Sequence, residues 1–131
     1  MLLLLGLVYG LAGPTIGNTS IGLESRSATR QLAAGLRKAR GLAVAEQRDA
    51  VLSLDVEARS FTVTGDPKVY SLSKRLDLAL FTAQSELTRD QVGNIRFFPD
   101  GSSTGGRITV EAGDSKLAVD VDWVTGRVTL E

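Results

Sequence analysis

The chain opens on a strongly apolar, uncharged run, MLLLLGLVYGLA, which ends at Gly13-Pro14. A lone membrane-spanning helix needs about 20 apolar residues, and this run supplies about half of that length. It lacks the basic segment and the small-residue cleavage site of a secretory signal peptide. Two interpretations are open: a buried core segment or internal strand, and the second half of a membrane helix whose first half is missing. We expect the second, because a chain seldom begins with a run of leucines.

Residues 1–20 are therefore predicted to be the remnant of a hydrophobic membrane and assembly helix. A proline inside a helix removes one backbone hydrogen bond and bends the axis, which fits Pro14. Gly17, Asn18 and Ser20 would then loosen the chain or cap a new helix. The residues expected to form the membrane and assembly helix are Leu2, Leu3, Leu4, Leu5, Leu7, Val8, Leu11 and Pro14.

A helical pattern follows over residues 21–48. Its apolar positions are three or four residues apart and make one narrow stripe, formed by Ala28, Leu32, Leu36, Ala39 and Ala43. Four basic residues lie largely off this stripe, namely Arg26, Arg30, Arg37 and Lys38. A basic helix face can contact phosphates, but a solvated face is the commoner arrangement and the one that we expect.

From about residue 50 the hydrophobic period changes to two. The alternation covers 51–63, resumes over 69–80 after a turn at Gly65-Asp66-Pro67, and returns at 95–98, 107–111, 116–122 and 124–130. We expect about seven short strands and a long loop over 82–93. One helix followed by a run of strands indicates an α+β fold, with a long N-terminal helix packed on a C-terminal antiparallel β-sheet. Residues 21–131 would form a single domain.

Trp123 continues the apolar face of the strand expected over 116–122. On that face it follows Leu117, Val119 and Val121, so we expect it in the core rather than in a binding hot spot. The Thr125-Gly126 pair would form a tight turn or bulge before the last strand.

Two polar clusters are candidate sites. The segment from Gly101 to Gly106 is rich in glycine and could cradle a phosphate, but it has no Walker lysine and lies between strands, so a hairpin connection is expected. Its polar tip could still contact a neighbouring subunit. Asp120 and Asp122 share a strand face with Ala118 and could bind calcium or act as a carboxylate pair. Two acids on one exposed face are usually only solvated, and we expect no metal.

Composition excludes several kinds of chemistry. The chain has 131 residues with no cysteine and no histidine, so a Ser-His-Asp or Cys-His catalytic arrangement is impossible. Fifteen basic residues balance fifteen acidic ones, which gives no general electrostatic case for nucleic acid. We therefore expect neither an enzyme nor a cofactor.

Three stretches resemble the GspH/FimT family of pilin-like proteins. Residues 27–55, SATRQLAAGLRKARGLAVAEQRDAVLSLD, are similar to the family's passage from helix to first strand. Residues 97–110, FFPDGSSTGGRITV, and 121–130, VDWVTGRVTL, are similar to its later segments, the last being typical of pseudopilin H. The motif residues, expected to be structural or to contact subunits, are Phe98, Pro99, Asp100, Gly101, Gly105, Gly106, Trp123, Thr125, Gly126 and Arg127.

One departure from the family is informative. The family carries a prepilin leader, a cleavage site after Gly and a Glu early in the mature helix, and none of them is found here. Aligning Pro14 with the family's helix proline puts that Glu a few residues before Met1. We therefore expect the sequence to be truncated at its N-terminus.

The resemblance implies a minor pseudopilin of type II secretion. Such a protein crosses the inner membrane once, with its sheet domain in the periplasm, and prepilin peptidase matures the full-length precursor. It joins the other pseudopilins, major and minor, in a short pseudopilus that helps to export folded proteins. The alternative is a FimT/FimU-like minor pilin that primes a type IV pilus or binds DNA. The acidic surplus after Glu111 disfavours DNA, and no nucleic-acid partner is expected.

Overall fold

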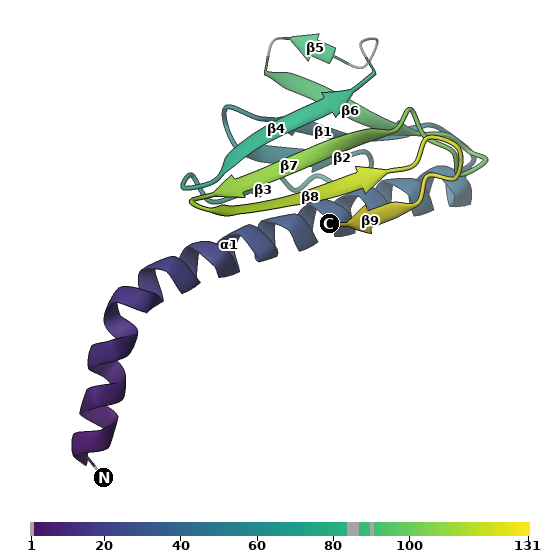
Figure 1. The fold of residues 1–131 in the computed structure, drawn as a ribbon. Helices are drawn as coiled ribbons and strands as arrows, with labels where there is room; N and C mark the ends of the chain where they lie inside the picture. Colours follow the sequence, from purple (N-terminus) through teal and green to yellow (C-terminus); the bar gives the residue numbers. More distant parts are fainter. Residues whose placement is uncertain (1, 84–86, 90) are drawn as a thin grey trace.

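The computed structural model describes residues 2–83, 87–89 and 91–131. It begins with one long helix, α1 (Leu2–Glu46), which contains Pro14 and bends in its N-terminal part (Figure 1). The apolar opening is thus helical, as expected. The helix does not restart at Gly17, Asn18 or Ser20; those residues lie within it. Within the described residues, no helix has the length and apolar character needed to cross a membrane.

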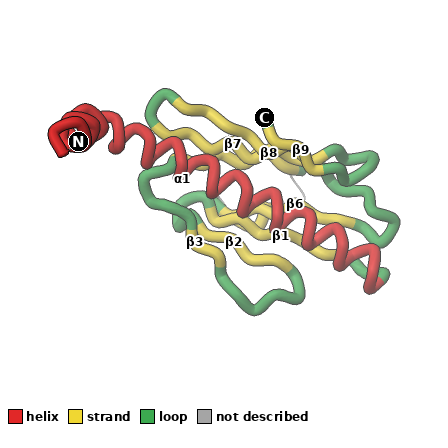
Figure 2. The backbone as a smooth tube through the Cα atoms, turned by 90° about the horizontal axis from the view of Figure 1, so that it is seen from below, coloured by secondary structure: helices red, strands yellow, loops and turns green. Residues whose placement is uncertain are grey.

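The nine strands of the described residues form two antiparallel sheets. The first sheet has the order β3 (Tyr70–Ser71), β2 (Ser60–Val63), β1 (Ala50–Asp55), β6 (Val92–Phe97) and β5 (Leu87–Arg89). The second has the order β4 (Asp77–Thr82), β7 (Gly106–Ala112), β8 (Ser115–Val121) and β9 (Val128–Leu130). Seen from below, α1 runs across both sheets (Figure 2).

The predicted α+β fold with a helix packed on antiparallel strands is confirmed, but the expectation that these strands form a single sheet was wrong. The chain leaves the first sheet after β3, and β4 pairs with β7, with Leu78 opposite Val110. It returns for β5 and β6 and then crosses again to β7. The long loop expected over 82–93 was also wrong in part, because β5 and the start of β6 lie within it. Residues 84–86 and 90 of that loop lie outside the described residues.

The core lies between the apolar stripe of α1 and the two sheets. All five predicted stripe residues are buried, and Leu32 and Leu36 are fully inaccessible. From the first sheet come Leu52, Leu54, Ile95 and Phe97, and from the second Ile108, Val110 and Val119. Small residues let the helix approach closely: a Cβ on Gly35 would lie 2.8 Å from the Phe61 ring. The four basic residues placed off the stripe are exposed, as predicted.

Candidate functional site

The two later family-like stretches meet beside the C-terminal part of α1. Residues 98–105 connect β6 to β7, and residues 122–127 connect β8 to β9; we call these two loops together the loop cluster. Figure 1 shows both loops at the end of the sheets that lies farthest from the N-terminus. The Ser103 amide donates a hydrogen bond to the Trp123 carbonyl at 3.0 Å, which joins the two loops directly.

Arg40 joins both loops to the helix. Its Nε lies 3.1 Å from the Gly101 carbonyl oxygen and 3.2 Å from the Thr125 carbonyl oxygen, and it donates to both. Just after the helix ends at Glu46, the Gln47 side chain donates a hydrogen bond to the Pro99 carbonyl at 3.3 Å. Sequence reasoning missed Arg40, because nothing in the local pattern separates it from the solvated basic residues around it.

The glycines of the cluster are required by close backbone packing. Gly101 and Gly126 both have positive φ angles, of 91° and 72°. A Cβ on Gly126 would lie only 1.9 Å from the Gly101 carbonyl oxygen and 2.9 Å from Arg40 Nε. Side chains rarely adopt such φ values, and here there is also no room for one. These two motif positions therefore have a structural role.

The backbone amides of the first loop donate hydrogen bonds within the protein, which argues against a phosphate cradle. Gly101 donates to Phe98, Ser102 donates to the Asp100 carboxylate, and Thr104 donates to Arg96. The remaining two amides, of Ser103 and Gly105, donate to the Trp123 carbonyl and to the Ser103 hydroxyl. No amide from 101 to 105 is left for an anion. The expected hairpin was also wrong: this loop passes from one sheet to the other.

Asp100 is held in its charged form by the same loop. Its Oδ1 accepts a hydrogen bond from the Ser102 hydroxyl at 2.6 Å and another from the Ser102 amide at 2.9 Å. These two bonds lower the pKa of the Asp100 carboxyl from its ordinary value.

Asp120 and Asp122, the candidate metal pair, each have partners within the protein. Asp122 Oδ1 accepts hydrogen bonds from the amides of Val124 and Thr125, at 2.8 and 3.3 Å, and so shapes the second loop. Asp120 lies 4.0 Å from the Arg107 guanidinium. In the part of the chain that the structure describes, no three residues of ligand type gather in a metal-binding arrangement.

The placement of Trp123 in the core was wrong, because its side chain is 69% exposed. The strand β8 ends at Val121, and the turn centred on the Asp122 carboxylate breaks the alternation that would have placed Trp123 inside. Val124, next to it, is 58% exposed. The signal that could have corrected the prediction is the turn-forming Asp followed by Thr125-Gly126. For the same reason β9 is shorter than the strand expected over 124–130.

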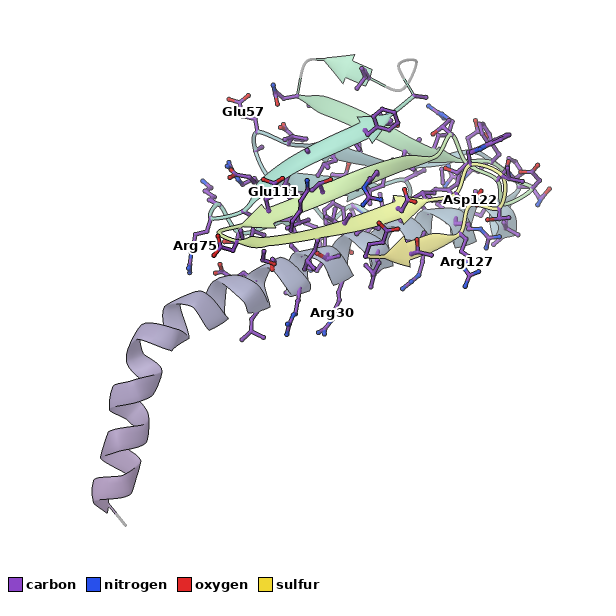
Figure 3. The ribbon with its side chains drawn as sticks, in the orientation of Figure 1. Arg30, Glu57, Arg75, Glu111, Asp122 and Arg127 are labelled. Carbon is purple, nitrogen blue, oxygen red and sulfur yellow. The ribbon has the colours of Figure 1, made fainter. Side chains whose placement is uncertain are left out.

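A groove of about 930 Å³ borders the loop cluster. Three arginines from two parts of the chain, Arg37, Arg40 and Arg127, share it with residues of the second loop and β9. Arg37 Nη2 donates to the Val128 carbonyl at 3.2 Å. Arg127 lies on the second loop, on the side of α1 (Figure 3).

The sequence model of the Type II transport protein GspH family matches residues 28–126. The chain belongs to this GspH family. The matched range begins at Ala28 in the buried stripe and ends at Gly126, so it contains strands β1 to β8 and nearly all of the loop cluster, and it stops just before β9. The resemblance found in the sequence is thereby confirmed.

Known relatives agree with GspH membership. The chain is 34% identical over 125 residues to the type II secretion system protein H of Xanthomonas campestris pv. campestris, which covers 95% of this chain and 73% of that protein. The fold is similar to that of the minor pseudopilin EpsH of Vibrio cholerae, with a TM-score of 0.64 and 16% identity over 82% of this chain and 96% of that one. It is equally similar to the type IV minor pilin FimU of Pseudomonas aeruginosa, with a TM-score of 0.64 and 16% identity over 82% and 88%.

Proposed function

We propose that this GspH-family chain is a minor pseudopilin, a structural subunit of the type II secretion pseudopilus that helps to export folded proteins across the outer membrane. The observation that carries the proposal is the family match over residues 28–126, joined to a helix that extends well beyond the sheets (Figure 1). A β-rich head on a projecting apolar helix is the form that a filament subunit requires. No catalytic role is proposed.

The apolar first part of α1 is proposed as the assembly stem. Residues 1–20 would lie in the inner membrane before assembly, with residues 21–131 in the periplasm, once prepilin peptidase has matured the full-length precursor. In the filament the stem would pack against the stems of the other pseudopilins, with about 25 cal/mol gained for each Å² of apolar area that leaves water. Because lipid already covers the same surface in the membrane, the transfer between the two states is nearly balanced.

Deletion of the gene in its native host tests this function. The expected result is that substrates of type II secretion accumulate in the periplasm and disappear from the medium, and that the wild-type gene restores their export. Unchanged export in the deletion strain, with the protein shown to be expressed in the parent, would contradict the proposal.

A FimU-like role in a type IV pilus is the second candidate, supported by the equal structural similarity to FimU. It makes a different prediction for the same strain. Loss of surface pili and of twitching motility, with secretion intact, would favour the pilus.

A further inference from the structure

The groove beside the loop cluster gathers positive charge that the protein itself does not neutralise. Arg37 and Arg40 line it from α1, and Arg127 lines it from the second loop. The ion pairs of the described residues use other arginines and lysines, and none of them involves these three. The one acid in the lining is Asp122, whose Oδ1 accepts two hydrogen bonds from the amides of its own turn.

Two of the arginines are oriented by the fold and still have donors to offer. Arg40 donates through Nε to two carbonyls, and Arg37 through Nη2 to the Val128 carbonyl. A guanidinium has five N–H groups in a fixed planar fork, so each keeps several for a ligand. Such forks match the two oxygens of a carboxylate. The groove therefore offers anchored carboxylate-binding groups, together with the exposed side chain of Arg127.

The other wall of the groove is a sheet edge. The residues Val128, Thr129 and Leu130 of β9 line it, and β9 is the last strand of the second sheet. Asp122 pairs with Arg127 and Ala118 with Glu131 through backbone hydrogen bonds. Because the bonds of an antiparallel pair alternate, the backbone groups of Val128 and Leu130 point away from β8. Arg37 uses one of them, the Val128 carbonyl.

We propose that this groove binds an extended acidic segment of another pseudopilin. The carboxylates of the segment would pair with Arg37 and Arg127, and its backbone would lie along the outer edge of β9. The identity of the partner as a pseudopilin rests on the proposed function, whereas the acidic, extended chemistry rests on the groove itself. The short length of β9 limits the added pairing to a few residues.

The surroundings favour carboxylates of a protein over nucleic acid. Phosphate backbones are held by cations spread along a path, and each neutralised phosphate adds to the affinity. Here the three arginines lie in one bounded groove. Asp122 lies in the lining, and Asp120 and Glu131 lie in the chain around it; these acids would repel a polyanion that ran beyond the groove.

A peptide-binding assay tests the proposal on the full chain in detergent. The probe is a short fluorescent peptide of alternating Glu and Thr, and the reference is the same peptide with Gln in place of Glu. Arg127→Glu reverses a charge in the groove. The Arg127 side chain makes no ion pair within the described part of the chain, so the substitution breaks no ion pair that stabilises the fold. Arg30→Glu is the matched control, because this substitution makes the same change in net charge. Arg30 lies outside the groove and points away from the sheets on the outer face of α1 (Figure 3).

The expected results separate the groove from general electrostatics. The Glu peptide binds more tightly than the Gln peptide, Arg127→Glu weakens its binding about tenfold, and Arg30→Glu weakens it less than about twofold. Equal weakening by both variants, or equal binding of both peptides, would overturn the proposal. So would a single-stranded oligonucleotide that binds the same groove more tightly than the Glu peptide does.

A second measurement tests the partner. Each of the other pseudopilins encoded beside the gene is captured with the wild-type chain, with Arg127→Glu and with Arg30→Glu. If Arg127→Glu fails to capture one pseudopilin that the wild type and Arg30→Glu both capture, the proposal is supported. If both variants capture every pseudopilin that the wild type captures, the partner of the groove is not a pseudopilin. If export is unchanged in the deletion strain, the proposed function is contradicted, while the peptide assay still decides whether the groove binds acidic segments.

Discussion

At the scale of single residues, Gly126 makes the sharpest prediction. We expect Gly126→Ala to destabilise the protein by at least about 2 kcal/mol more than Gly113→Ala does. Both glycines have positive φ, 72° and 59°, so both variants incur similar backbone strain. They differ in space: a Cβ at Gly126 meets the Gly101 carbonyl, whereas at Gly113 nothing lies within 4 Å. Urea unfolding measures both, and equal losses would show that the loops do not pack as described.

Asp66 makes a prediction about pH. Its carboxylate accepts hydrogen bonds from Lys38 Nζ at 2.7 Å, from the Tyr70 hydroxyl at 2.6 Å and from the Lys68 amide at 2.9 Å. The Lys38 bond is the largest cause, and together they hold the pKa of Asp66 far below its ordinary value. A depressed pKa adds stability above the unfolded value of about 4, and that stability is lost as the pH falls toward the folded value.

The variant Asp66→Asn should remove this dependence. Between about pH 5 and pH 2 the free energy of unfolding of the wild type should fall more steeply than that of Asp66→Asn. Asp114→Asn, in the exposed turn after β7, is the control and should keep the wild-type slope. Urea unfolding at a series of pH values gives both slopes, and equal slopes for Asp66→Asn and the wild type would contradict the role given to Asp66.

Single-residue roles were the least predictable from sequence. The positions of Gly101 and Gly126 were singled out, because turn chemistry is local. Their packing against each other was not foreseen, because it depends on two loops that are distant in sequence. Trp123 was misplaced, since period-two alternation cannot show where a turn interrupts a strand.

At the scale of elements, α1 offers a matched pair of glycines. Gly41→Ala should stabilise the protein by about 0.5 to 1 kcal/mol, since alanine is the better helix former and nothing lies within 4 Å of its Cβ. Gly35→Ala has the same helical gain, but its Cβ would meet Phe61 and Leu52 at 2.8 and 3.0 Å. It should therefore cost about 1 to 3 kcal/mol. Thermal and urea unfolding compare the two, and a stabilising Gly35→Ala would refute the close packing of helix on strands.

The helix and strands could be predicted from the sequence where a local hydrophobic period marks them. The buried stripe of α1 and the strands β1, β2, β7 and β8 matched their periodicity closely. Division into two sheets could not be predicted, because alternation is the same whichever sheet a strand joins. The division into two sheets depends on the pairing of β4 with β7, which places Ala79 opposite Thr109, a residue that is distant in the sequence.

At the scale of the whole molecule, the head and the projecting helix divide the work. The two sheets pack on the C-terminal part of α1, and the loop cluster lies at the end of the head farthest from the N-terminus (Figures 1 and 2). The arginine groove borders the loop cluster. The N-terminal part of α1 lies clear of the sheets (Figure 1). This separation leaves one end for the filament stem and the other for neighbouring heads, which is the arrangement that the proposed function requires.

Cysteine cross-linking in the native host tests the stem-in-filament arrangement most directly. The chain has no cysteine, so Leu7→Cys introduces the only thiol in the stem, and Thr62→Cys, on the exposed side of β2, is the control in the head. In cells that make every pseudopilin, each with a cysteine at the matching stem position, we predict that Leu7→Cys cross-links to another pseudopilin and that Thr62→Cys does not. A Leu7→Cys protein that is expressed, supports secretion and never cross-links to another subunit would contradict the account.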